Sequence, residues 1–149
     1  MRRHSPQKIT SNVRYLTAKQ RFGDAIMNDR QIFGAFLKTK RNEREIPIRL
    51  MAEQVGIKPG YFNDIESGRR TPIELDLLDR IVETLRLSDE DRQTFFDLAG
   101  KAREAAPPDL TGYINNTQKA RIALRVAKDK ATDADWEQFT RYLNEKKEE

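Results

Sequence analysis

Cysteine is absent from this 149-residue chain, and histidine occurs once, as His4. Without cysteine the chain can form no disulfide, no thiolate metal site and no cysteine nucleophile. His4 has no acid placed beside it, and the sequence contains no HExxH motif, no glycine-rich phosphate loop after a strand and no calcium-binding loop. We therefore expect no catalytic residues, no cofactor and no bound metal, and we expect that the protein is not an enzyme.

Long hydrophobic runs are also missing. The longest apolar runs are only a few residues, too short to span a membrane, and residues 1–26 lack the apolar block of a secretory signal. A chain of this length supports one core of ordinary size with a small appendage. These observations predict a soluble cytoplasmic protein with no membrane partner.

Positive charge is concentrated at the N-terminus. Residues 1–26 hold six lysines and arginines against one aspartate, so this segment supplies +5 and the rest of the chain carries −1, giving the net charge of +4. A basic arm of this kind adds phosphate contacts to nucleic acid whatever the base sequence. The other interpretation is a weakly ordered leader, and the sequence leaves both open.

Residues 46–72, IPIRLMAEQVGIKPGYFNDIESGRRTP, have the layout of a helix-turn-helix. Four apolar residues spaced i, i+3, i+4 and i+7 predict a first helix with one buried face. These residues are Ile48, Met51, Ala52 and Val55. Gly56 can adopt the left-handed conformation that ends a helix, and Pro59 suits the first turn of the next one. Gly68 is expected to end that second helix.

The second helix is predicted to bury one side and to present small or short polar residues on the other. Its buried side consists of Phe62, Ile65 and the stem of Glu66, and its outward side consists of Gly60, Asn63, Asp64 and Ser67. Asparagine can pair with adenine, and aspartate can accept from cytosine. For Asp64 the alternative is an exposed helix residue that reads no base.

These segments resemble the helix-turn-helix domain of the XRE family, the lambda-repressor and Cro-like regulators, over roughly residues 31–105. The matching segments are Leu37–Arg41, Ile48–Ile57, Tyr61–Gly68, the string RRTP, and Leu75–Leu87. The resemblance implies that Gly60, Tyr61, Asn63 and Asp64 lie where the family reads bases. It implies a place near the DNA backbone for Arg49, Lys58, Arg69 and Arg70, and it implies that Arg41 pairs with Glu66.

The sequence departs from the family pattern at three positions. Pro59 and Gly60 stand where many relatives carry polar base readers, so Asn63 and Asp64 must do more of the reading. Leu50 stands where relatives usually carry an acid. It is either a contact for a partner or a scattered surface leucine.

Further helices are expected on both sides of the motif. Residues 31–40 predict an opening helix whose apolar side carries Ile32, Phe33, Phe36 and Leu37. Thr71-Pro72-Ile73-Glu74 reads as a capping box for a fourth helix, with core residues Leu75, Leu78, Ile81, Val82 and Leu85. Ser88 is predicted to cap a fifth helix that runs toward Ala105, with Gly100 as a weak point and Pro107-Pro108 as its stop.

Two amphipathic helices are predicted after the double proline. Asn116 or Thr117 can cap the first, and Thr132 can cap the second. Their apolar residues are Ile122, Leu124, Val126, Trp136, Phe139, Tyr142 and Leu143. A pair of this size cannot bury its apolar face alone, so we expect it to pack on the fifth helix or on a second copy.

The sequence therefore predicts an all-α protein. A five-helix lambda-repressor-like domain at 31–106 follows a basic extension at 1–30, and a helical segment for dimerisation or partner binding follows at 107–149. The predicted function is that of a sequence-specific DNA-binding regulator, a homodimeric repressor on an inverted repeat in double-stranded DNA. The alternative is an antitoxin or phage-type protein-interaction module that holds a protein partner through residues 109–149.

Overall fold

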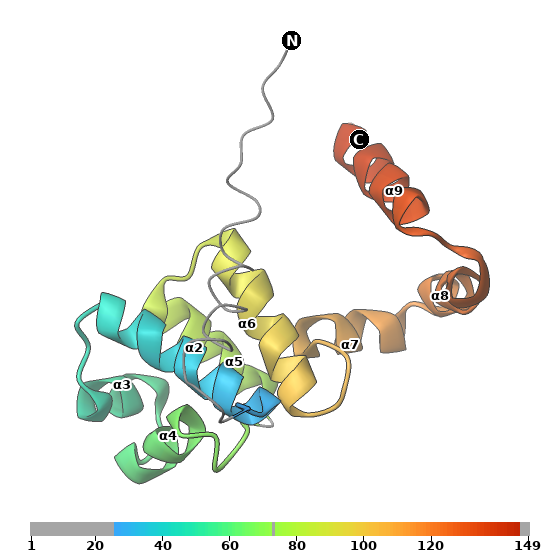
Figure 1. Cartoon of the computed structure of the whole chain (residues 1–149). Coiled ribbons are helices and arrows are strands. Elements are labelled where there is room, and N and C mark those ends of the chain that lie inside the picture. Colours follow the sequence, from blue (N-terminus) through green and yellow to red (C-terminus); the bar gives the residue numbers. More distant parts are fainter. Residues whose placement is uncertain (1–25, 73, 147–149) are drawn as a thin grey trace. The chain divides into compact units, whose positions relative to one another are not determined.

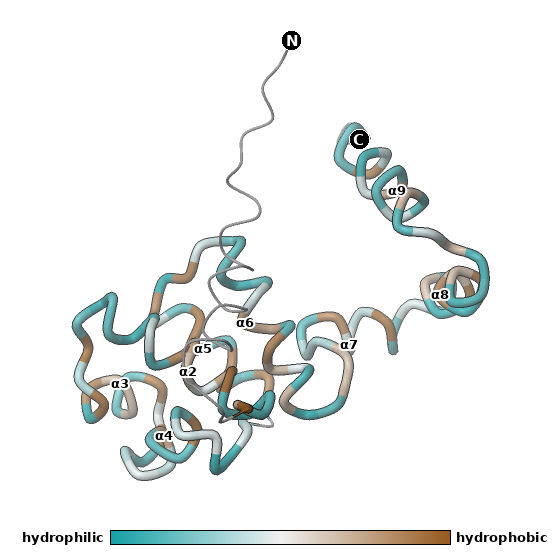
Figure 2. Tube along the Cα trace, viewed as in Figure 1, coloured by the Kyte–Doolittle hydropathy of each residue, from teal (hydrophilic) through white to brown (hydrophobic). Residues whose placement is uncertain are grey.

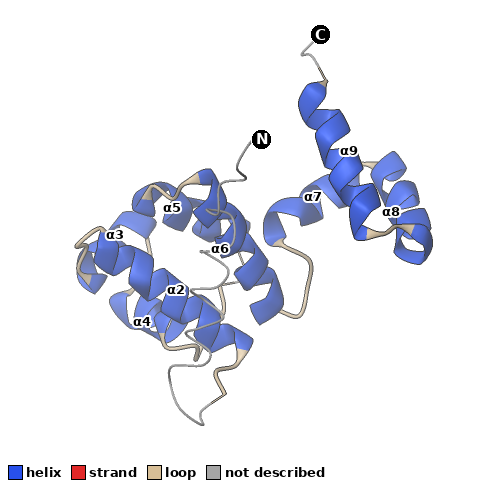
Figure 3. Ribbon diagram, turned by 45° about the horizontal axis from the view of Figure 1, so that its top comes forward, coloured by secondary structure: helices blue, strands red, loops and turns tan. Residues whose placement is uncertain are grey.

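The structure, a computed structural model, describes residues 26–72 and 74–146. All the regular elements in these ranges are α-helices, which confirms the predicted fold class (Figure 3). The helices are α2 (Asp29–Glu43), α3 (Ile48–Val55), α4 (Pro59–Glu66), α5 (Leu75–Leu85), α6 (Asp89–Ala102), α7 (Pro108–Asn116), α8 (Gln118–Lys130) and α9 (Asp133–Glu145). Most of the predicted basic extension, residues 1–25, lies outside the described residues.

The chain divides into two units, Met1–Asp109 and Leu110–Glu149. In the first unit α2 packs against α4 and α6, and α3 packs against α4 and α5 (Figure 1). The centre of the core is aromatic: the ring of Phe95 lies 5.2 Å from that of Phe33 and 5.4 Å from that of Phe96, centroid to centroid. The predicted core residues Phe36 and Leu37 of α2 are buried as well.

A buried ion pair joins the end of α2 to the end of α4. Arg41 Nε donates to Glu66 Oε1 at 2.6 Å, and Arg41 Nη2 donates to Glu66 Oε2 at 3.1 Å. The third donor, Nη1, reaches the carbonyl oxygen of Ile46 at 2.9 Å. Two parallel bonds between a guanidinium and a carboxylate fix both position and angle. The pairing implied by the family resemblance is therefore confirmed.

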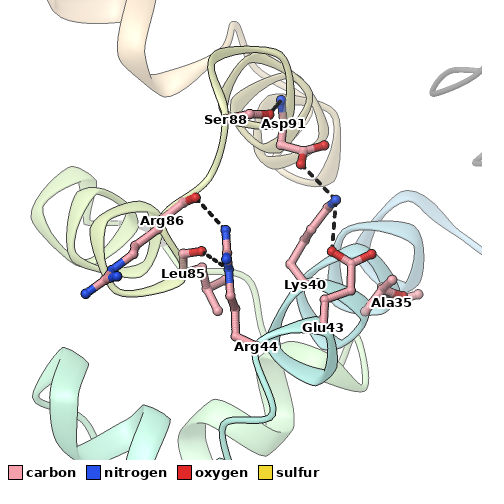
Figure 4. Close-up of polar contacts among 9 residues, drawn as sticks. Ala35, Lys40, Glu43, Arg44, Leu85, Arg86, Ser88 and Asp91 are labelled. Carbon is pink, nitrogen blue, oxygen red and sulfur yellow. Dashed lines mark hydrogen bonds and ion pairs between the residues drawn. The ribbon is translucent and has the colours of Figure 1, made fainter. Parts of the chain in front are cut away.

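The C-terminal end of α2 is also tied to the loop between α5 and α6 (Figure 4). Arg44 donates from Nε to the carbonyl of Leu85 and from Nη2 to that of Arg86, both at 2.9 Å, and so caps carbonyls that α5 leaves unpaired. Lys40 Nζ lies 2.8 Å from an Asp91 carboxylate oxygen in α6. These contacts hold α2, α5 and α6 as one frame.

Two glycines permit close approach of α2 to the region around α4. A Cβ on Gly34 would lie 2.3 Å from the Glu66 carbonyl oxygen and 2.6 Å from that of Ile65. Gly68 has φ +78, and a Cβ there would meet the backbone nitrogen of Gln31 at 2.9 Å. The close approach of α2 to α4 therefore depends on the absence of a side chain at these two positions.

The predicted capping box at Thr71–Glu74 is wrong. Helix α5 begins at Leu75, its N-cap is Glu74 without a side-chain bond, and the buried Thr71 Oγ1 has no hydrogen-bond partner among the described residues. Pro72 is buried, so this stretch connects α4 to α5 instead of starting a helix. Leu75, at the first helical position, is 40% exposed, whereas Leu77 joins the core in its place.

The predicted end of the fifth helix is also wrong. Ser88 does cap α6, by accepting from the Asp91 backbone nitrogen, but α6 ends at Ala102. The chain then turns through Glu104, whose φ is +53, and Pro108 is the first residue of α7. Gly100 is no weak point: it is buried, and a Cβ there would meet the Pro107 nitrogen at 2.9 Å.

The C-terminal segment contains three helices where two were predicted, because α7 went unrecognised. Helix α7 has only nine residues and contains Gly112 in its middle, so the sequence shows no clear helical period there. Thr132 caps α9 as predicted, since its side chain accepts from the Asp135 backbone nitrogen. In return, the Asp135 carboxylate accepts hydrogen bonds from the Thr132 backbone N–H and from the Thr132 hydroxyl. These two bonds, the backbone bond more than the hydroxyl bond, lower the pKa of the Asp135 carboxyl group. Thr117 precedes α8 without a side-chain cap.

Hydrophobic and hydrophilic residues alternate along α8 and α9 (Figure 2). None of the residues of either helix is buried in the described part of the chain. Nowhere in residues 26–72 or 74–146 is a helix both long enough and apolar enough to cross a membrane.

Candidate nucleic-acid interface

Helices α3 and α4 and the turn between them form the helix-turn-helix that the sequence predicts. Gly56 ends α3 in the left-handed conformation, with φ 76 and ψ 32, and Pro59 is the first residue of α4. The Val55 carbonyl at the end of α3 accepts from Arg80 Nε of α5 at 2.9 Å. The glycine turn thus joins the two helices, and Arg80 ties the end of α3 to α5.

One side of α4 is fixed in the core. Phe62 and Ile65 are fully buried, and Glu66 is buried in its bond to Arg41, as predicted. Met51, Ala52 and Val55 of α3 are buried against the same core. Because α4 cannot rotate without breaking these contacts, its opposite side is presented to the surroundings in a fixed orientation.

The predicted interface residues fall into two groups. Within the described part of the chain, four of them are exposed, and none of the four makes a side-chain hydrogen bond or ion pair. These are Arg49 on α3, Lys58 at the N-cap of α4, and Gly60 and Asn63 on α4. No atom lies within 4 Å of the position that a Gly60 Cβ would take, so the surface there is open.

The other four predicted residues, Tyr61, Asp64, Arg69 and Arg70, form a connected group that we call the Asp64 cluster. Asp64 Oδ1 accepts from Arg69 Nε at 2.8 Å and lies 2.8 Å from Arg69 Nη2. The second oxygen, Oδ2, lies 3.8 Å from Arg70 Nε. The Arg70 guanidinium also lies over the Tyr61 ring, 5.8 Å from its centroid. Sequence reasoning placed these residues at the interface but missed that they bind one another.

The backbone explains why the Asp64 cluster forms. After α4 ends, the backbone N–H groups of Arg69 and Arg70 both return to the Asp64 carbonyl oxygen, at 2.9 and 3.1 Å. The turn at Gly68 makes this return possible. An acid followed five and six residues later by arginines across a glycine is a signal that predicts such a contact. In the free protein the Asp64 carboxylate is therefore already bound to Arg69, and its contact with a cytosine, one of its two predicted roles, stays a prediction.

Within residues 26–72 and 74–146, no three His, Asp or Glu side chains lie close enough together to hold a metal ion. The predicted interface residues include one amide, three arginines and a lysine beside an open helix surface. Amide groups are suited to base edges, and guanidinium and ammonium groups to phosphate oxygens.

Comparison with known families assigns the same region to the same class. Residues 32–95 match the family model described as a helix-turn-helix domain. This range contains α3, the Gly56 turn and α4, with the helices that support them. Residues 32–95 are therefore similar to helix-turn-helix domains. The XRE assignment within that class stays a prediction.

Two proteins from two strains of Mycobacterium tuberculosis are similar to this chain, and each is described as an uncharacterized HTH-type transcriptional regulator. Each is 33% identical over 57 residues, which cover 38% of this chain and 40% of the relative. The chain thus matches about two fifths of the length of these relatives. The crystal structure of the clp gene regulator ClgR from Corynebacterium glutamicum is 28% identical, with a TM-score of 0.42, and covers 60% of this chain and 93% of that one.

Proposed function

We propose that this protein is a sequence-specific, DNA-binding transcriptional regulator that inserts α4 into the major groove of double-stranded DNA. The observation that carries the proposal is the fixed, outward side of α4. It presents the unpaired amide of Asn63 beside the open surface at Gly60, with arginines at its C-terminal end. The names of the M. tuberculosis relatives support the same function.

In this proposal each group has its own role. Asn63 reads a base, with adenine as the natural partner of its amide. Arg49 and Lys58 contact phosphates at the start of the motif, and Arg69 and Arg70 contact them at its end. Tyr61 holds Arg70 through its ring face. Gly60 lets the helix approach the groove closely because it carries no side chain.

We further propose that the protein acts as a homodimeric repressor that occludes a promoter. One helix contacts too few base pairs for regulatory specificity, whereas two half-sites about one DNA turn apart provide it. The direct test is selection of bound sequences from random duplex DNA by the full chain. Recovery of an inverted repeat is the expected result, and recovery of no preferred sequence contradicts the proposal.

Asn63→Ala is expected to weaken binding to the selected DNA by about 1–3 kcal/mol while leaving the affinity for random DNA nearly unchanged. The reason is that an amide that reads a base contributes only where that base is present. Arg70→Ala, the comparison variant, should weaken binding to both DNAs alike and reduce the salt slope by about 1. Titrations at several salt concentrations measure both quantities, and equal losses on both DNAs for Asn63→Ala would exclude a reading role.

The Asp64 cluster leads to a different prediction. Because Asp64 neutralises Arg69 in the free protein and lies near Arg70, Asp64→Asn should raise the affinity for random duplex DNA. The expected rise is about 1.4- to fivefold, since an exposed ion pair is worth about 0.2–1 kcal/mol. Asp76→Asn on α5 changes the charge equally without touching the cluster and is the matched control.

Loss of a negative charge near phosphate would also raise DNA affinity, so the same substitution is repeated with Arg69→Gln and Arg70→Gln present. If Asp64 acts by restraining the arginines, Asp64→Asn has no effect in that background. A rise of the same size there would show simple repulsion between Asp64 and DNA.

The exposed Leu50 on α3, 43% exposed, favours a second function. In that case the helix-turn-helix surface binds a protein, as in an antitoxin or a phage-type inhibitor, and the partner is held through residues 109–149. Two results together would support this function over the first. The chain would select no preferred DNA sequence, and it would bind a protein partner in a way that Leu50→Lys abolishes.

A further inference from the structure

The C-terminal unit exposes apolar faces on two consecutive helices. On α9, Trp136, Phe139 and Leu143 recur at i, i+3 and i+7 and are 41%, 50% and 48% exposed. The rings of Trp136 and Phe139 meet edge to face, with centroids 6.3 Å apart, so they form one continuous patch. On α8, Ile122 and Val126 are similarly exposed one turn apart. Exposed apolar patches of this kind mark interaction surfaces.

The two helices carry opposite charge. Residues 118–130 hold five lysines and arginines and one aspartate, a net charge of +4, whereas residues 133–145 hold four acids and one arginine, a net charge of −3. Both helices are 13 residues long, which corresponds to about 20 Å each. A basic helix and an acidic helix of equal length, each with an apolar face, are complementary in net charge and in length.

We infer that α8 of one copy packs against α9 of a second copy, and α9 of the first against α8 of the second. This inference rests on the proposed dimeric regulator and names the surface that holds its dimer. A two-fold axis forms both contacts at once, because each copy supplies one helix of each sign. The apolar patches then become the core of the contact, and the charges at its rim determine which helices pair.

Charge reversal on exposed positions tests this pairing in the full chain. The first variant carries Lys119→Glu, Arg125→Glu and Lys128→Glu, which changes α8 from +4 to −2. The second carries Glu137→Lys and Glu145→Lys, which changes α9 from −3 to +1. Arg121 and Asp135 are left intact because Arg121 donates to the Ile114 and Asn115 carbonyls and Asp135 completes the cap of α9. All the new residues are strong helix formers, so both variants should stay helical.

Sedimentation at micromolar concentration and 0.15 M salt is expected to show three results. The wild type is dimeric. Each variant alone has a dissociation constant for self-association raised about tenfold or more, because helices of like charge now face each other. An equimolar mixture of the two variants is dimeric again, because acidic α8 meets basic α9 in one contact and basic α8 meets acidic α9 in the other. Circular dichroism confirms that each variant is folded.

Two outcomes would overturn the inference. Self-association of either variant alone with the wild-type dissociation constant would show that α8 and α9 do not form the contact. Weakened self-association in both variants that is not restored in their mixture would show that the two helices do not pair across copies. Neither outcome depends on DNA. A chain that dimerises as inferred but selects no DNA sequence would contradict the proposed function and leave this pairing intact.

Discussion

Replacing Glu66 with alanine is expected to lower the free energy of unfolding of the helix-turn-helix domain by about 3–5 kcal/mol. Glu66 holds the buried Arg41 guanidinium through two hydrogen bonds at the junction of α2 and α4. Without the carboxylate, a charged group stays buried with only the Ile46 carbonyl as an acceptor. Since small domains are stable by about 5–15 kcal/mol, this loss removes a large share of the total.

Urea unfolding followed by circular dichroism measures the loss. Glu53→Ala, on the exposed side of α3, is the control and should change stability by no more than about 0.5 kcal/mol. The double substitution Arg41→Met with Glu66→Leu should recover most of the loss, because it removes both charges and fills the space with apolar atoms. A loss below about 1 kcal/mol for Glu66→Ala, or a double variant less stable than the single one, would contradict this account.

Local chemistry explains which parts of the fold could be predicted from the sequence. The Gly56 turn, Pro59 at the start of α4 and the caps at Ser88 and Thr132 each depend on one residue acting on its own backbone. Such signals do not need the tertiary structure. The buried face of α4 could also be predicted from the sequence. The helical period of 3.6 residues places Phe62 and Ile65 on one side and Asn63 on the other.

The wrong predictions arose where packing overrides a local signal. Thr71 to Glu74 fits a capping box, but Pro72 is buried in the connection between α4 and α5, so the helix starts later. Gly100 looks like a helix breaker, although its lack of a side chain is what lets Pro107 approach. Contacts between elements distant along the chain, such as that of Gly34 in α2 with the end of α4, leave no periodic pattern in the sequence.

The sequence analysis predicted which residues lie at the candidate interface, but not the contacts that join them. Family resemblance placed Asp64, Arg69 and Arg70 on one surface, but the bonds among them depend on how the chain folds back after Gly68. Under the proposed function, this difference bears on how strongly the motif attracts phosphate. An arginine already bound to an acid offers less charge to nonspecific DNA than a free arginine does, so the number of arginines in the motif overstates its attraction for phosphate.

The second large effect is expected from Gly34→Ala. A methyl group there would lie 2.3 Å from the carbonyl oxygen of Glu66 and 2.6 Å from that of Ile65, and both of these atoms belong to backbone that cannot rotate away. Helix α4 must therefore move from α2. Overpacking of a core typically lowers stability by about 1–3 kcal/mol and occasionally by more. The better helix propensity of alanine offsets about 1 kcal/mol of this at most.

The displacement should affect DNA binding more than stability, because α4 carries Asn63 on the side opposite to the clash. We expect the folded Gly34→Ala protein, kept well below its unfolding temperature, to lose preference for the selected DNA while retaining binding to random DNA. Gly112→Ala on α7, where no atom lies within 4 Å of the new methyl group, is the matched control and should be neutral or stabilising by up to about 1 kcal/mol. Unchanged stability and unchanged sequence preference in Gly34→Ala would show that α2 does not set the position of α4.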